Sequence, residues 1–151
     1  MSDNEKAIAR IIETYKSAVW AKDVEALMRL YDRKVRVFDA WGVWSHENAE
    51  SWQRTVESWF SSLGSERVKV SFDDVAVSDA RESAIVSAIV TYASESPDGS
   101  TVRSMQNRLS WGLRTSGHVL RIVHEHTSAP IGFEDQKAIL RRDGGERGNS
   151  T

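Results

Sequence analysis

The chain of 151 residues contains no cysteine, and this absence narrows its chemistry. Without a thiol it has no disulfide framework, no thiolate nucleophile and no cysteine-type zinc site. A protein without disulfides suits a reducing compartment, so we expect a cytoplasmic location. The first six residues also lack the basic and then apolar order that is typical of a signal peptide.

An excess of charge of one sign is missing as well. The 20 basic and 22 acidic residues give a formal net charge of −2. This balance offers no electrostatic reason to expect nucleic acid or an anionic membrane as a partner, and no apolar run approaches the length of a membrane span. We therefore expect neither partner, and the length fits one domain.

Apolar residues with helical spacing dominate the first part of the chain. Ser2 and Glu5 form a plausible capping box before the first apolar stripe, and Asp23 can cap a second, short helix. A third stripe runs over residues 52–63 and ends at Gly64, where a left-handed cap is common. The pattern predicts three helices.

Period-two alternation then indicates long strands, at residues 34–38, 67–77, 84–93, 101–114 and 118–127. A phase slip at Asp73 and Asp74 predicts a β-bulge. Helices followed by strands predict an α+β fold, in which a cone-shaped, curved antiparallel sheet wraps around three N-terminal helices and leaves a hollow. We expect a domain over residues 1–134 and a tail over residues 135–151. Residues 144–151 have nothing apolar to bury, so the tail should be flexible at its end.

Two histidines, His124 and His126, lie inside a run that otherwise resembles a buried strand. Because successive side chains in a strand alternate between faces, both imidazoles should share a face with Leu120 and Ile122. The sequence therefore predicts two imidazoles projecting from an apolar wall into a pocket.

The preceding strand should add polar groups to this wall. If residues 115–117 form a three-residue hairpin loop, Arg108 lies opposite His124 and Gln106 opposite His126. Such a cluster is costly unless its groups bond to one another, to Asp39 or to a ligand. One alternative is a satisfied internal network in which Arg108 neutralises Asp39. Two histidines and a carboxylate also resemble a metal-binding face, but a guanidinium beside a metal is unfavourable, so we expect no metal.

Asp39 and Tyr15 are the remaining candidates for chemistry. Alternation places Asp39 on the inner face with Val35 and Val37, where burial would raise its pKa toward the range useful for proton abstraction. The alternative role for Asp39 is that of a helix-capping or loop-closing residue. Tyr15 lies on an apolar helix face, so its hydroxyl needs a partner, which is either a ligand oxygen or a backbone carbonyl.

The order of these elements, with Tyr31, residues 37–42, Arg108 and residues 122–130, resembles the nuclear transport factor 2-like superfamily. Within it, the chain is similar to the SnoaL-like and ketosteroid-isomerase-like branch over residues 5–134. The resemblance implies that Asp39 matches the general base and Tyr15 the tyrosine that donates to the enolate oxygen. These isomerases also carry a second aspartate on a later strand, and residues 100–116 contain no carboxylate. A related reaction, with Arg108 or protonated His124 as cationic partner, is therefore expected.

We accordingly expect a cofactor-independent acid–base enzyme that acts on a small hydrophobic carbonyl compound. Its reaction would be of the isomerase, cyclase or dehydratase/hydratase type, as in a ketosteroid-isomerase-like isomerase or lyase, or a polyketide-cyclase-like enzyme. The expected catalytic residues are Asp39, Tyr15, His124 and Arg108, and the expected substrate contacts are His126, Gln106, Phe38, Trp41, Trp52, Trp59 and Tyr92. The alternative is a non-catalytic protein of the same fold that binds a small ligand or acts as a dimeric interaction protein.

The strands at residues 84–93 and 109–113 are rich in apolar residues, which we interpret as apolar character on both faces. A sheet exposed to water on one side is normally polar there. We therefore expect a homodimer through the outer face of these strands.

Overall fold

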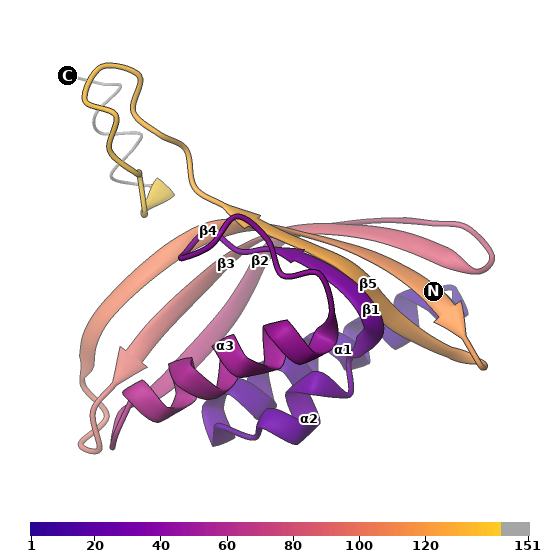
Figure 1. Ribbon diagram of the computed structural model, residues 1–151, viewed down its shortest axis with the longest axis horizontal. Helices are drawn as coiled ribbons and strands as arrows, with labels where there is room; N and C mark the ends of the chain where they lie inside the picture. Colours follow the sequence, from indigo (N-terminus) through magenta and orange to yellow (C-terminus); the bar gives the residue numbers. More distant parts are fainter. Residues whose placement is uncertain (143–151) are drawn as a thin grey trace.

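The computed structural model describes residues 1–142, so the expectation for residues 144–151 lies outside the described residues. The elements are α1 (Asp3–Ala21), α2 (Val24–Met28), β1 (Tyr31–Phe38), α3 (Ala49–Ser62), β2 (Arg67–Asp79), β3 (Ser83–Glu95), β4 (Thr101–Ser116) and β5 (Val119–Ser128). Figure 1 shows the helices together on the concave side of one curved sheet. The predicted α+β fold is confirmed. No helix within residues 1–142 is both long and apolar enough to cross a membrane.

The five strands are arranged in the order β1-β5-β4-β3-β2. Strands β2 to β5 pair antiparallel with their neighbours, as expected. β1 differs, because it pairs parallel with β5. Parallel neighbours need a long connection, and here it comprises α3 and the three intervening strands. Because β1 and β5 are parallel, their carboxyl ends lie together at the same end of the sheet.

The helix ends follow the sequence signals. The Ser2 hydroxyl accepts from the Glu5 backbone N–H (3.0 Å), and the Glu5 carboxylate accepts from the Ser2 N–H (3.2 Å), which completes the predicted capping box. Asp23 caps α2 by accepting from the Ala26 N–H. α3 is followed by Gly64, whose φ of +59° suits a residue without a side chain.

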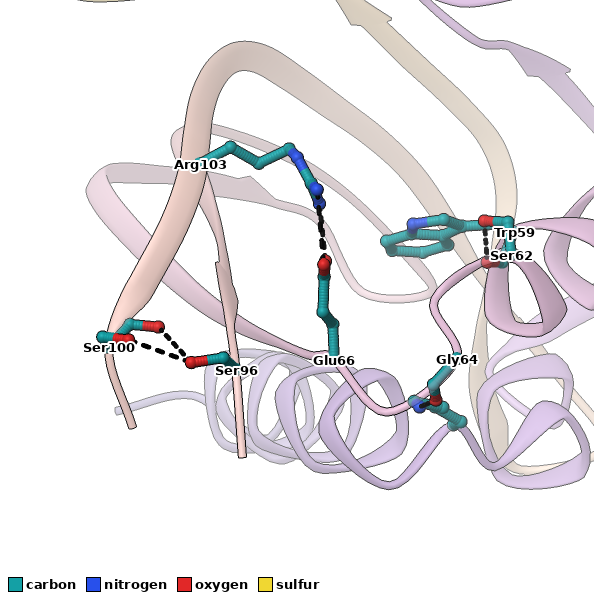
Figure 2. Close-up of polar contacts among 8 residues, drawn as sticks. Trp59, Ser62, Gly64, Glu66, Ser96, Ser100 and Arg103 are labelled. Carbon is teal, nitrogen blue, oxygen red and sulfur yellow. Dashed lines mark hydrogen bonds and ion pairs between the residues drawn. The ribbon is translucent and has the colours of Figure 1, made fainter. Parts of the chain in front are cut away.

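Polar contacts join the end of α3 to the sheet, as Figure 2 shows. Glu66, just before β2, accepts a 2.6 Å hydrogen bond from Arg103 of β4. At the β3–β4 turn, the hydroxyls of Ser96 and Ser100 lie 2.9 Å apart. The Trp59 indole points from α3 toward the sheet, where its ring centroid lies 6.0 Å from that of Tyr92. The contacts of Glu66 with Arg103 and of Trp59 with Tyr92 hold one end of α3 over the inner face.

Aromatic side chains fill the space between the helices and the sheet. Trp111 of β4 is fully buried, and its ring lies 5.8 Å from Tyr15 of α1 and 5.6 Å from Phe72 of β2. Edge-on aromatic contacts at such distances add stability beyond the area they bury. The centre of the expected hollow is therefore occupied by an indole.

The outer face of β4 is more polar than we expected. Leu109, Trp111 and Leu113 are all buried on the inner face. Arg108 and Ser110, which alternate with them along the strand, therefore face outward and are exposed. The premise that β4 is apolar on both faces is wrong, because its apolar residues follow a single phase of the alternation.

The predicted bulge in β2 is confirmed. Pairing with β3 shifts between Asp73 and Ala76, and Asp74 adopts a positive φ of +53°. After the shift Val77 lies opposite Val86, a buried inner-face residue. The extra residue therefore returns the apolar phase to the core.

The β4–β5 hairpin has a shorter loop than the sequence suggested. Ser116 pairs with Val119, so the loop is the two residues Gly117 (φ +57°) and His118 (φ +69°). Two consecutive positive φ values are typical of the type I′ turn, which matches the twist of a two-residue hairpin. The expected three-residue loop is wrong.

A second irregularity follows inside β5. Leu113 of β4 pairs with Ile122 of β5. Gly112, the residue before Leu113, pairs with His124, so Val123 is an extra residue on β5. An extra residue on one strand reverses the faces of all side chains beyond it. Ile122 and Glu125 consequently both face the core, where Ile122 is fully buried and Glu125 is 1% exposed.

Residues 130–142 continue past β5 and return to the sheet. Ile131 forms an isolated bridge with Ala138, and the backbone N–H of Gln106 in β4 donates to the Leu140 carbonyl (2.7 Å). The Arg142 N–H donates to the Gln106 side chain (2.8 Å). This segment therefore contacts the part of β4 that β5 does not reach.

Candidate functional site

The two histidines do not project into the interior as we expected. The bulge at Val123 moves His124 and His126 to the outer face of β5, where His124 is half-buried and His126 exposed. His124 Nδ1 lies 2.7 Å from the Arg36 carbonyl oxygen. Both imidazoles pack edge-on against the Phe38 ring, at centroid distances of 5.1 and 5.4 Å.

The expected cluster around Arg108 does not form. Arg108 pairs with Ser128 rather than with His124, is exposed, and donates from Nε to the Ser128 hydroxyl (3.1 Å). Gln106 is likewise not opposite His126. Its side chain donates to the Thr91 hydroxyl and accepts from the Arg142 N–H. The shorter hairpin loop and the bulge together change the register, so Arg108 neutralises no interior carboxylate.

The loop after β1 places Asp39 at the margin of the inner face. His46 pairs with Val37 through two backbone hydrogen bonds of 2.8 and 2.9 Å, so the loop folds back on the free edge of β1. The buried His46 ring lies 2.9 Å from the Ser51 hydroxyl of α3. This loop is thereby held between β1 and α3.

A pocket of about 570 Å³ opens between this loop and the end of the sheet. Its apolar wall includes Phe38, Val43 and Trp44. Its polar groups are Arg36, Asp39, Ser45, His126 and Thr127. A space of this size, apolar with a few polar groups, is typical of small-molecule sites. A larger groove of about 980 Å³ near the start of β1 is lined mainly by polar and charged side chains of both signs.

Asp39 is half-buried and lines this pocket. Burial raises the pKa of its carboxyl group, while the Thr127 hydroxyl, backbone N–H groups and nearby His46 partly oppose this rise. Thr127 accepts from the Ala40 N–H (2.9 Å) and donates to Asp39 Oδ1 (3.1 Å). The Thr127 hydroxyl therefore fixes the orientation of a partly desolvated carboxylate.

A second carboxyl group, that of Glu125, lies deeper in the same face. The Tyr31 hydroxyl (2.6 Å) and the Trp111 indole N–H (2.8 Å) both donate to its Oε1. Burial raises the pKa of Glu125 to about 7, although these two hydrogen bonds lower it; the charge of Asp39 adds to the rise. Glu125 therefore changes its ionisation near neutral pH.

Tyr15 faces the interior, as predicted, but its hydroxyl is already paired. It lies 2.9 Å from the hydroxyl of Tyr92 on β3. Burial is the main reason that the pKa values of Tyr15, Tyr31 and Tyr92 all rise, and the charge of Glu125 adds to each of them. The tyrosines are therefore neutral donors or acceptors around Glu125.

The other expected substrate contacts are dispersed. Phe38 and His126 line the pocket. Trp41 is 56% exposed at the loop surface, and Trp52, only 6% exposed, packs against Tyr31 at a centroid distance of 6.4 Å. Trp59 and Tyr92 contact each other on the inner side, at a centroid distance of 6.0 Å, and neither lines this pocket. Asp39 and two of these predicted contacts therefore share one pocket.

Sequence reasoning missed Glu125, Thr127 and the loop residues Val43 and Trp44. Nothing local marks the bulge, because both phases of β5 carry polar residues after Ile122. Two closely spaced histidines offered the stronger chemical pattern. For the loop, the one available signal was the density of aromatic residues around Gly42.

Residues 8–132 match the family model of the SnoaL-like domain. Among solved structures, a nuclear transport factor 2-like protein of unknown function from Pseudomonas putida is similar, with 22% identity and a TM-score of 0.79 over 91% of this chain and 94% of that one. Aln2 from a Streptomyces species shares 11% identity, with a TM-score of 0.75 over 85% and 91%. A putative aromatic ring hydroxylase from Novosphingobium aromaticivorans shares 14%, with a TM-score of 0.67 over 95% and 99%. At these identities the structures establish the fold alone. No curated protein matches the chain.

Proposed function

The chain belongs to the SnoaL-like domain family, and on that premise we propose that it is a cofactor-independent acid–base enzyme. Its substrate class would be a small hydrophobic carbonyl compound. The family's nuclear transport factor 2-like fold includes isomerases and cyclases. The observation that carries the proposal is the Asp39 carboxyl group, which is partly desolvated, oriented by Thr127 and exposed to a pocket of about 570 Å³.

In the proposed reaction Asp39 is the base. Its carboxylate takes a proton from the carbon next to the carbonyl, and the electrons of the C–H bond move to the carbonyl oxygen to give an enolate. The return of the proton to another position gives an isomer, whereas attack of the enolate on a second carbonyl gives a cyclic product. A raised pKa favours this role, since an ordinary aspartate is a weak base.

The pocket supplies contacts for the rest of the substrate. Phe38, Val43 and Trp44 offer apolar surface to its body, and the exposed His126 imidazole can donate to the carbonyl oxygen. His124 supports the wall by packing on Phe38. Arg108 is not part of this proposal, because it does not line the pocket and its guanidinium donates to the Ser128 hydroxyl.

The test is the exchange of protons in small ketones for deuterium in D₂O, followed by NMR. The wild-type protein should exchange protons next to the carbonyl, and Asp39→Asn should lose on the order of 10²-fold or more of the rate. Asp3→Asn, an exposed aspartate of α1, is the matched control and should keep the rate. Equal rates in the Asp39→Asn and wild-type proteins would remove Asp39 from the mechanism.

One observation favours a second candidate, a non-catalytic protein that binds a small ligand. The fully buried Trp111 occupies the centre of the cone, where enzymes of this kind need space for a substrate. Trp44, which is 97% exposed and lines the pocket, provides the readout for this alternative. Quenching of its fluorescence by a ligand, without any exchange in D₂O, would favour binding over catalysis.

A further inference from the structure

Glu125 is a buried carboxyl group without a cationic partner, which is unusual in a protein. Its side chain is 1% exposed, and both of its hydrogen bonds come from uncharged donors, Tyr31 on β1 and Trp111 on β4. Within residues 1–142 it forms no ion pair with a basic residue. A buried charge in this setting is costly, so the group gains by holding its proton.

The strand register places Glu125 close to Asp39. Glu125 pairs with Val37 of β1, and Asp39 follows Val37 by two residues. Asp39 accepts from Thr127, which follows Glu125 by two residues on the same face. A strand rises about 3.3 Å per residue and adjacent strands lie about 4.8 Å apart, so the Cα atoms of these two positions are about 8 Å apart. Two carboxylates on neighbouring positions, among buried side chains, oppose each other's ionisation, and the charge of Asp39 adds to the rise in the pKa of Glu125.

Among the groups that face this pair within residues 1–142, most cannot carry a positive charge. Tyr31, Tyr15 and Tyr92 reach it from β1, α1 and β3, and burial raises the pKa of each hydroxyl, so all three stay neutral. His46, in the loop before α3, is the one titratable cation that acts on Asp39 within residues 1–142. α3 itself contributes Trp52, which does not titrate. His46 therefore offsets part of the effect at Asp39, whereas no cation acts on Glu125 within residues 1–142.

We propose that Glu125 is a positioning residue that acts on Asp39 through its charge, so that the two carboxyl groups gain and lose protons as a coupled pair. This inference rests on the proposed function for its consequence in catalysis. Below neutral pH the pair holds one proton, on the deeper Glu125, and Asp39 is free to accept a proton from the substrate. Above neutral pH Glu125 ionises, and its charge makes Asp39 a stronger base.

The coupling is measured by carboxyl ¹³C NMR on protein labelled at glutamate. Glu125 is the signal that titrates near neutral pH, and its absence from Glu125→Gln assigns it. In Asp39→Asn the midpoint of Glu125 should fall by about one pH unit, because the negative charge of Asp39, which opposes the ionisation of Glu125, is lost. In the control Asp3→Asn the midpoint should not move. An unchanged midpoint in Asp39→Asn would overturn the inference.

The pH dependence of proton exchange gives a second readout. The wild-type profile should rise again near neutral pH, and this second inflection should be absent from Glu125→Gln, which keeps the acceptor for Tyr31 and Trp111. A Gln variant that retains the inflection contradicts the inference. If Glu125→Gln does not fold, Glu125→Asp assigns the signal. The midpoint of Glu125 in Asp39→Asn then still tests the inference. Because the midpoint does not depend on activity, an active Asp39→Asn enzyme with a lowered midpoint refutes the proposed function but not the coupling.

Discussion

Replacement of Glu125 by glutamine should change how the stability of the fold depends on pH. In the unfolded chain this glutamate titrates near its ordinary pKa of 4.5, whereas burial raises the pKa in the folded protein to about 7. Between these values the folded state binds more protons than the unfolded state. The contribution of Glu125 to the free energy of unfolding is therefore fully present below pH 4.5 and is lost as pH rises through 7.

The expected size follows from the difference between the two pKa values. One pKa unit corresponds to about 1.4 kcal/mol, so the wild-type protein should lose about 3 kcal/mol of unfolding free energy from this group by pH 8. Screening by solvent does not reduce this value, because the Glu125 side chain is 1% exposed. Glutamine keeps an oxygen that accepts from Tyr31 and Trp111 but carries no charge, so this slope should disappear.

Urea denaturation from pH 4.5 to pH 8, followed by tryptophan fluorescence, measures the effect. Glu134→Gln, which changes an exposed glutamate, is the matched control and should follow the wild-type curve. The same slope in Glu125→Gln and wild type would mean that Glu125 is not the buried group that titrates.

Further predictions concern the sheet. Arg108→Leu should change the unfolding free energy by less than about 0.5 kcal/mol, because the guanidinium is exposed; a loss of several kcal/mol in urea would contradict the outward orientation. Trp111→Phe should cost about 2 kcal/mol or more in the same assay, since Glu125 then loses one of its two donors. Gly117→Ala should cost about 1 kcal/mol, because φ is +57° there, and a neutral result would argue against the type I′ turn. We still expect a homodimer through the outer face of β3, where Ile85 is 63% exposed; sedimentation should give a dimer for wild type and a monomer for Ile85→Glu, and a wild-type monomer would exclude it.

Much of the fold follows from short-range patterns. The capping box at Ser2 and Glu5, the cap at Asp23 and the turn at Gly64 depend on neighbouring residues, and the structure has all of them. The bulge at Asp73 could be predicted because apolar residues in opposite phases flank it. The inward position of Asp39 could be predicted as well, because Val35 and Val37, which precede it, alternate in phase with it and are buried.

The interior of the site could not be predicted, because its side chains depend on pairing between strands. The bulge at Val123 has no apolar phase change to mark it, since Glu125 and Thr127 are polar on the buried side while His124 and His126 are polar on the exposed side. Only the fit of Trp111 and Tyr31 around one carboxyl group distinguishes the two phases. That fit joins residues far apart in the sequence.

The segment after β5 has a consequence for how the protein can be shortened. β5 ends opposite Arg108, so the backbone of β4 before that residue would offer free hydrogen-bonding groups to any passing strand. The Leu140 carbonyl accepts from the Gln106 backbone N–H on this edge, and the Arg142 N–H donates to the Gln106 side chain beside it. Exposed strand edges are templates for association between chains. A protein cut at residue 134 would keep every helix and strand and still become prone to aggregate, so the last described residues serve solubility as well as structure.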